Sequence, residues 1–208
     1  MILEYIGLEK MSKFLYNNSI ATKGGMRVAD SNITKRALAS ALKELMTEEP
    51  FSKISVTDIC ERCGMNRKSF YYHFKDKYDL VNWIFDSEFL LLVRDNSAKT
   101  SWELFDVLCH YLYDNRKFYK PALQIEGQNS FSDHFREMLR VTLRSSFSGL
   151  LDEYEDFQLN FYADALVCTI ERWLTSKKCD TPDEFLKKVG SCARSFSKIS
   201  DKVLPPEK

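Results

Sequence analysis

Glycine and proline are scarce in this sequence, with 7 glycines and 5 prolines among 208 residues. An all-β sandwich needs frequent turns and a dinucleotide-binding fold needs a glycine-rich loop, so the composition disfavours both classes. Net charge is lacking as well, because 30 basic residues balance 30 acidic ones. The chain as a whole therefore has no field that would draw nucleic acid or a membrane surface to it non-specifically.

Long hydrophobic runs are also missing. The apolar stretch at residues 89–93 is far shorter than the ~18 residues that a membrane-spanning helix needs. Near the N-terminus, Glu4 and Glu9 interrupt an apolar start and no basic segment precedes it, which argues against a secretory signal. The 6 cysteines lie scattered along the chain, a usage typical of reduced thiols rather than of a disulfide framework. We expect a cytoplasmic protein with no membrane partner.

The sequence is rich in helical periodicity. Hydrophobic residues make up 44% of the chain, enough for a core, and they recur at spacings of three and four. No segment shows the alternation of a strand, so we expect an all-α fold. Capping residues place the helix starts: Ser31 or Asn32, then Ser55, Asp76, Ser132 and Thr181. The predicted helices span about residues 31–48, 56–63, 66–74, 77–94, 102–113, 118–123, 132–149, 157–175 and 182–198.

Residues 1–30 differ from the rest because they are turn-rich and only marginally helical. We expect a poorly ordered N-terminal extension there. Met26 directly follows two glycines and is a candidate start of the native chain, in which case residues 1–25 do not belong to it. The remainder is predicted to form a helix-turn-helix domain at 31–77 and a helical regulatory and dimerisation domain at 78–208.

The first three predicted helices form a helix-turn-helix unit. The second and third are joined by a tight turn at residues 63–66, where Gly64 supplies a left-handed residue. In such units the final helix enters the major groove of DNA. Between Arg62 and Lys77 there are five basic residues against one acidic residue, Asp76. This strip can neutralise phosphates although the whole chain is neutral.

The side chains of helix 66–74 divide by chemistry. Phe70 and Phe74 lie four residues apart and are expected to pack inward on Leu42 and Ile59. An outward arginine can read guanine through two parallel hydrogen bonds. Hydroxyl and phenol groups suit phosphate oxygens, which fix register without carrying sequence. The outward set predicted to face DNA is Asn66, Arg67, Lys68, Ser69, Tyr71, Tyr72, His73, Lys75 and Lys77.

Residues 55–80 read SVTDICERCGMNRKSFYYHFKDKYDL, which resembles the DNA-binding signature of TetR-family transcriptional regulators. The resemblance covers about residues 31–85. It implies a sequence-specific homodimer on a double-stranded DNA operator, with a C-terminal domain that dimerises and usually binds an effector. Lys68 departs from the small residue, often glycine, that is common at its position, which leaves the base preference open. By position, the residues implied to contact DNA are Thr57, Asn66, Arg67, Lys68, Ser69, Tyr71, Tyr72, His73 and Lys77.

Residues 43–46, 50–54 and 78–85 resemble a narrower branch of that family, which includes activators of dihydroxyacetone kinase operons. This branch implies control through a kinase-like protein partner. No motif in the C-terminal half fixes the effector, so a small molecule and a protein both stay open, as do activation and repression.

The two last predicted helices, 157–175 and 182–198, each have one broad apolar side. Together with the resemblance, this predicts a four-helix dimer interface. A two-fold dimer would place its recognition helices roughly 34 Å apart on a near-palindromic operator. Helix 77–94 is expected to transmit conformational change between the two domains.

Other interpretations are weaker. Helices 31–74 could merely pack, or the chain could be an interaction module that recruits a protein while DNA contact is secondary. Cys60 and Cys63 have a zinc or redox spacing, but no second Cys/His pair accompanies them, so they are predicted to be core residues. No catalytic motif is present, and we expect no enzyme activity, no cofactor and no metal.

Isolated histidines and aromatic residues admit two interpretations each. His110 could line a ligand pocket, although a core or surface position is favoured. His134 falls in the first turn of its helix and is predicted to be solvated, as is the acidic loop 152–156. Aromatic residues at helical spacing are predicted to be plain core rather than an effector site: Trp102, Phe105, Phe118, Tyr119 and Phe135.

Overall fold

The computed structural model describes residues 28–95, 100–125, 127 and 130–203. Within these ranges the chain forms nine helices and no strand, which confirms the predicted all-α fold. The predicted extension at residues 1–30 falls almost entirely outside them. The helices are α2 (Val28–Glu48), α3 (Val56–Arg62), α4 (Arg67–His73), α5 (Lys77–Asp95), α6 (Ser101–Asp114), α7 (Arg116–Leu123), α8 (Phe131–Ser146), α9 (Glu155–Thr175) and α10 (Pro182–Val203).

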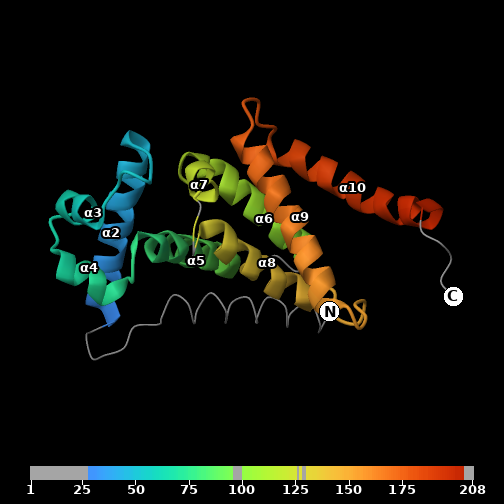
Figure 1. Cartoon of the computed structure of the whole chain (residues 1–208), viewed down its shortest axis with the longest axis horizontal. Helices are drawn as coiled ribbons and strands as arrows, with labels where there is room; N and C mark the ends of the chain where they lie inside the picture. The colour runs from blue at the N-terminus through green and yellow to red at the C-terminus, as the bar shows by residue number, and fades with distance from the viewer. Residues whose placement is uncertain (1–27, 96–99, 126, 128–129, 204–208) are drawn as a thin grey trace.

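The helices fall into two groups joined by α5 (Figure 1). We call residues 28–74, which hold α2, α3 and α4, the head, and residues 101–203 the body. Helix α5 packs against α2 in the head and against α6 and α8 in the body. Helix α2 also contacts α7, so the head touches the body directly. In the described part of the chain, no helix is long and apolar enough to cross a membrane.

Side-chain caps begin several of these helices where the sequence predicts them. Ser55 and Asp58 form a capping box that starts α3. Asp76 Oδ1 accepts hydrogen bonds from the backbone N–H groups of Tyr78 and Asp79, at 2.9 and 2.8 Å. Such caps satisfy N–H groups that have no partner inside the helix.

Several helix starts differ from the prediction. Helices α7 and α9 each begin two residues early, at Arg116 and Glu155, so α9 includes the end of the predicted acidic loop 152–156. Helix α2 begins at Val28, three residues before Ser31, and α8 is capped by Ser130 instead of Ser132. Where several polar residues follow one another, each can serve as a cap, so sequence alone leaves the start uncertain by two or three positions. The hydroxyl of Ser132 is used elsewhere, because it donates to the carbonyl of Leu123 at 2.8 Å.

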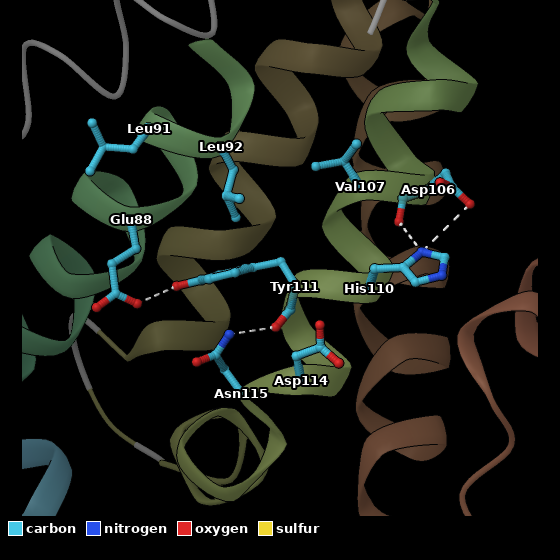
Figure 2. Close-up of a pocket in the computed structure, with 9 residues that line it drawn as sticks. All are labelled: Glu88, Leu91, Leu92, Asp106, Val107, His110, Tyr111, Asp114 and Asn115. Atoms are coloured by element: carbon cyan, nitrogen blue, oxygen red, sulfur yellow. Dashed lines mark hydrogen bonds and ion pairs between the residues drawn. The ribbon is translucent and has the colours of Figure 1, made fainter. Parts of the chain in front are cut away.

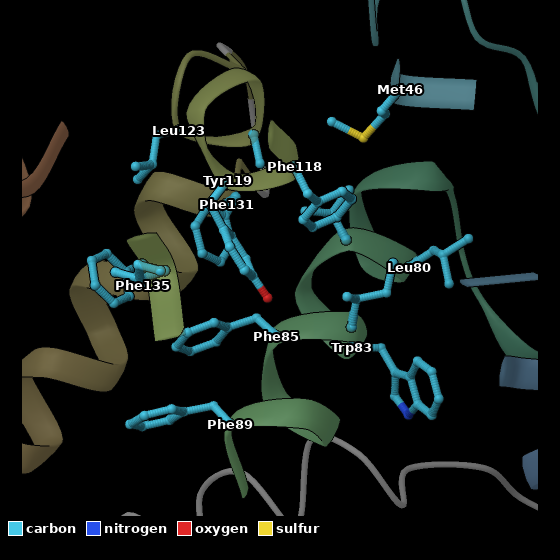
Figure 3. Close-up of a cluster of buried hydrophobic side chains, with 14 of the residues drawn as sticks. Met46, Leu80, Trp83, Phe85, Phe89, Phe118, Tyr119, Leu123, Phe131 and Phe135 are labelled. Carbon is cyan, nitrogen blue, oxygen red and sulfur yellow. The ribbon is translucent and has the colours of Figure 1, made fainter. Parts of the chain in front are cut away.

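The body core is built around the ring of Phe85 on α5 (Figure 3). Its centroid lies 5.3 Å from those of Phe89 and Phe131, 5.6 Å from that of Phe135 and 6.0 Å from that of Tyr119. All five residues are fully or almost fully buried. Helices α5, α7 and α8 are therefore held together by aromatic contacts, each of which contributes about 0.5–1.5 kcal/mol beyond its buried area.

Two predictions about the body are wrong. Trp102 is 48% exposed instead of core, since helical spacing gives the phase of a side chain but not whether a neighbour covers it. His134 is not solvated, because only 13% of its side chain is exposed and its Nε2 lies 2.6 Å from Asp86 Oδ1 on α5. Burial raises the pKa of the Asp86 carboxyl, while the hydrogen bond to His134 lowers it.

Candidate nucleic-acid interface

The turn between α3 and α4 fixes the direction of α4. Gly64 has a φ of +67°, a conformation that a side chain would strain. The next residue, Met65, donates its backbone N–H to the carbonyl of Cys60 at 2.8 Å and so closes the end of α3. Asn66 then caps α4, since its Oδ1 accepts from the backbone N–H of Ser69 at 2.9 Å. Gly64 therefore acts as the sequence predicts, whereas Asn66, which was expected inside the helix, is its N-cap.

The inner side of α4 is anchored by aromatic residues. Phe70 is 0% and Phe74 is 3% exposed, and both belong to the same buried cluster as Leu42 and Ile59, as predicted. The ring of Phe74 lies 5.7 Å from that of Trp83 on α5. These contacts hold α4 against the rest of the head and against α5.

The outer side of α4 is polar, aromatic and exposed. Asn66, Arg67 and Lys68 are exposed at its first turn, and Tyr71 and Tyr72 are 51% and 48% exposed. Exposed tyrosines on a short helix suggest a binding surface. Their phenol hydroxyls can form hydrogen bonds to the phosphate oxygens of a DNA backbone.

Arg67 and Tyr71 contact each other across one helical turn. The guanidinium NH2 of Arg67 lies 3.5 Å from the hydroxyl of Tyr71, and its centre lies 5.8 Å from the ring centroid. A guanidinium held over an aromatic face keeps its outer N–H groups free for a bidentate contact. The arginine is thereby held on the exposed side of α4 before any ligand arrives.

Four other predicted residues are half-buried: Thr57 on α3, Ser69, His73 and Lys77. Burial and the nearby Lys35 lower the pKa of His73, so its imidazole is neutral at physiological pH. Its Nδ1 is buried and has no hydrogen-bond partner among the described residues. His73 thus brings no positive charge to this surface.

Lys77 has a role that the sequence did not reveal. Its Nζ donates to the carbonyls of Phe51 and Ile54, both at 2.7 Å, and lies 4.3 Å from the Phe51 ring centroid. Burial lowers the pKa of this half-buried amine. Lys77 therefore ties the α2–α3 loop to the start of α5, and its contact with phosphate stays a prediction.

Not all of the basic strip is available to DNA. Arg62 is turned back into the head, with NH2 2.6 Å from Glu48 Oε2 and NH1 3.6 Å from Glu44 Oε2. With Lys77 bonded to carbonyls and Arg62 paired with two glutamates, the other cations of the strip, all exposed, are Arg67, Lys68 and Lys75.

Cys60 and Cys63 lie on the packed side of α3. Cys60 is buried, and the Sγ of Cys63 donates to the carbonyl of Ile59 at 3.3 Å. Burial raises the pKa of both thiols, so they stay protonated and are poor metal ligands. Across the described ranges, no three potential ligands from His, Cys, Asp and Glu come together around a possible ion.

Two family models match the chain. One, described as bacterial regulatory proteins of the tetR family, matches residues 38–84. The other, described as a transcriptional regulator C-terminal region, matches residues 100–195. The two matches fall on the head with the start of α5 and on the body.

Curated relatives point the same way. The HTH-type dhaKLM operon transcriptional activator DhaS of Lactococcus lactis subsp. lactis (strain IL1403) is 29% identical over 154 residues, covering 71% of this chain and 82% of that protein. The transposon Tn10 TetC protein of Escherichia coli is 23% identical over 152 residues, covering 67% of this chain and 76% of that protein.

Solved structures share the fold. A dihydroxyacetone kinase operon activator DhaS superposes with a TM-score of 0.59 at 23% identity, covering 80% of this chain and 97% of that one. A TetR transcriptional regulator from Streptococcus agalactiae 2603V gives a TM-score of 0.59 at 22% identity, covering 77% of this chain and 93% of that one.

Proposed function

The chain belongs to the TetR family of transcriptional regulators, and from this premise we propose that it acts as a homodimer whose α4 helices read a near-palindromic operator under effector control. It is a regulator and not an enzyme. The observation that carries the proposal is the exposed side of α4, where Arg67 is held over Tyr71 beside further polar and aromatic groups. We place this activity in the cytoplasm.

The nine residues predicted from the sequence are the proposed DNA contacts, with different roles. Arg67 and Lys68, at the first turn of α4, are assigned to base edges, because the N-terminal end of a recognition helix reaches deepest into the major groove. The remaining residues are assigned to the backbone or to positioning: Thr57, Asn66, Ser69, Tyr71, Tyr72, His73 and Lys77.

Apolar surface on α9 and α10 supports a dimer. Phe157 and Phe161 are 73% and 51% exposed on α9, and Phe196 and Ile199 are 54% and 56% exposed on α10. They recur at spacings of four and three, so each helix carries an apolar stripe on the side away from its own core. The C-terminal part of α10 extends away from the other helices of the body (Figure 1). Stripes of this kind on a monomer indicate a missing partner, and a second copy supplies matching stripes.

Helix α5 is the proposed route of control, because it packs on both head and body. We assign the reading unit to residues 31–77 and the regulatory and dimerising unit to residues 78–208. The two units can adopt more than one relative arrangement. An effector that binds one arrangement more tightly shifts the equilibrium toward it, by an amount set by the difference between its two affinities. That effector is a small molecule or a protein. The relative from L. lactis is named an activator of the dhaKLM operon, so a dihydroxyacetone kinase operon is the first place to look for an operator.

Selection of genomic fragments tests the proposal. Purified full-length protein is mixed with fragments of the source genome at near-physiological salt, and bound fragments are sequenced. We expect enrichment of one near-palindromic site. Sequence-blind, salt-sensitive binding would contradict the proposal, and a co-purifying protein would then favour the interaction-module alternative.

A further inference from the structure

A hollow of about 670 Å³ lies between α5 and α6 (Figure 2). Part of its wall is apolar, formed by Leu91 and Leu92 of α5 and Val107 of α6. The volume falls within the range of about 300–1,000 Å³ that is usual for sites of small organic molecules. The hollow is thus large enough for a compact ligand, and its wall can bury an apolar group.

The charged part of the wall has one sign. Three carboxylates line the hollow, those of Glu88, Asp106 and Asp114, and no lysine or arginine is among its lining residues. His110 lies beside Asp106, with Nδ1 3.6 Å from the carboxylate, and is its one basic side chain. Such a wall repels anions and attracts cations.

Glu88 links this hollow to the head. Its Oε1 is 2.5 Å from Nζ of Lys43 on α2, and its Oε2 accepts from the hydroxyl of Tyr111 at 2.7 Å. Tyr111 in turn contacts the hydroxyl of the fully buried Tyr119. Burial raises the pKa of Tyr111, so its phenol keeps its proton and remains a donor to Glu88. Lys43 also lies 5.5 Å from the Phe118 ring centroid of α7. The same carboxylate therefore faces the hollow, holds α2 to α5 and, through Tyr111, is bonded to α6 of the body.

We infer that the hollow binds an organic ammonium ion with an apolar body, and that the ammonium competes with Lys43 for the carboxylate of Glu88. This inference rests on the proposed function and names its effector class. When the ammonium pairs with Glu88, the Lys43 tie between α2 and α5 is lost, and the head is freer to change its position relative to α5. The coupling is reciprocal, so loss of the tie must strengthen ammonium binding.

Three matched probes test the charge preference. Phenylbutylammonium, phenylbutanol and phenylbutanoate share an apolar body and differ in their head group. Isothermal titration of the full-length protein without DNA should show the ammonium binding at least tenfold more tightly than the other two. Equal binding of all three, or no binding of the ammonium, would overturn the inference.

Variants separate the competition from general electrostatics. Lys43→Met should bind phenylbutylammonium several-fold more tightly than wild type, whereas Lys53→Met, which removes the same charge from an exposed loop of the head, should not. Asp114→Asn should weaken binding several-fold, whereas Glu153→Gln, in the α8–α9 loop, should leave it unchanged. An unchanged or weakened affinity of Lys43→Met would contradict the competition.

A DNA measurement distinguishes this inference from the function on which it rests. The ammonium should change the affinity of wild type for the selected operator, and this change should be smaller in Lys43→Met. Intact operator binding without any ammonium effect would overturn the inference and leave the proposed function standing. Absence of any preferred DNA site would overturn the proposed function, whatever the calorimetry gives.

Discussion

Arg67 is the one arginine on α4, and its environment prepares it for reading a base. The ring of Tyr71 lies beneath its guanidinium, so part of the entropy of ordering a long side chain is lost before DNA binds. Lys68, its neighbour, offers a point charge without a planar fork. We therefore expect this one side chain to supply most of the discrimination between DNA sequences, and the surrounding groups to supply affinity for DNA.

Replacement of Arg67 tests that division. Arg67→Lys keeps the charge but loses the bidentate geometry, so it should cost about 1–3 kcal/mol of operator binding and leave binding to shuffled DNA nearly unchanged. Arg67→Ala should lose the same discrimination and also weaken shuffled DNA slightly. Both affinities are measured by fluorescence anisotropy. If both variants kept the full affinity for the operator, Arg67 would not be a residue that contacts the bases.

Replacement of Lys77 tests its structural bonds. Lys77→Met leaves the carbonyls of Phe51 and Ile54 without their donor, which should lower the free energy of unfolding by about 1–3 kcal/mol. Lys75→Met, an exposed lysine two residues away, is the control and should change stability by less than about 0.5 kcal/mol. Urea denaturation measures both. If the two variants unfold alike, the carbonyl bonds do not matter for stability.

Individual residues show where sequence reasoning works and where it ends. Gly64, Asn66, Phe70 and Phe74 were predictable, because turns, caps and helix faces depend on neighbours within a few positions. The partners of Arg62, Lys77 and His134 were not, since each pair joins residues 14 to 48 positions apart. The sequence thus predicts which cations lie near the interface but not which of them are already engaged.

At the scale of elements, the α3–α4 pair depends on a turn that only one residue type suits. Gly64 has a positive φ, and a Cβ placed there would meet no atom within 4 Å. A side chain at position 64 would therefore cost free energy through backbone strain and not through a steric clash. Because α4 begins three residues later, that strain acts directly on the angle of this helix.

Substitutions at Gly64 should follow backbone preference. Gly64→Ala should destabilise the protein by about 1–2 kcal/mol, the cost of a left-handed conformation for an L-residue with a Cβ. Gly64→Asn should cost less, because asparagine tolerates this region better. Thermal and urea unfolding give the order. A larger loss in Gly64→Asn than in Gly64→Ala would contradict the backbone explanation.

At the scale of the whole molecule, α9 has two apolar sides with different partners. Ile170, Trp173 and Leu174 are buried in the body, whereas Phe157 and Phe161 face solvent. The sequence predicted one broad apolar side on this helix, with Phe161 beside Ile170 and Trp173, and that prediction is wrong. Periodicity alone could not divide these residues between core and surface. That division needs the positions of α8 and α10, which are set by contacts distant in sequence.

A charge on the exposed side of α9 should prevent dimerisation without unfolding the monomer. Phe161→Glu should sediment as a monomer where wild type sediments as a dimer, because a carboxylate in an apolar interface is costly to desolvate. Ile33→Glu is the matched control, since Ile33 is 66% exposed on α2, and it should remain dimeric. A dimeric Phe161→Glu would place the interface elsewhere.

One titration of the wild-type protein shows whether this regulator reads a DNA sequence. Fluorescence anisotropy at near-physiological salt compares the selected operator with a shuffled duplex of the same composition. We expect the operator to bind at least about 10³-fold more tightly, the lower end of the range for specific regulators. Equal affinity for the two duplexes would contradict the account.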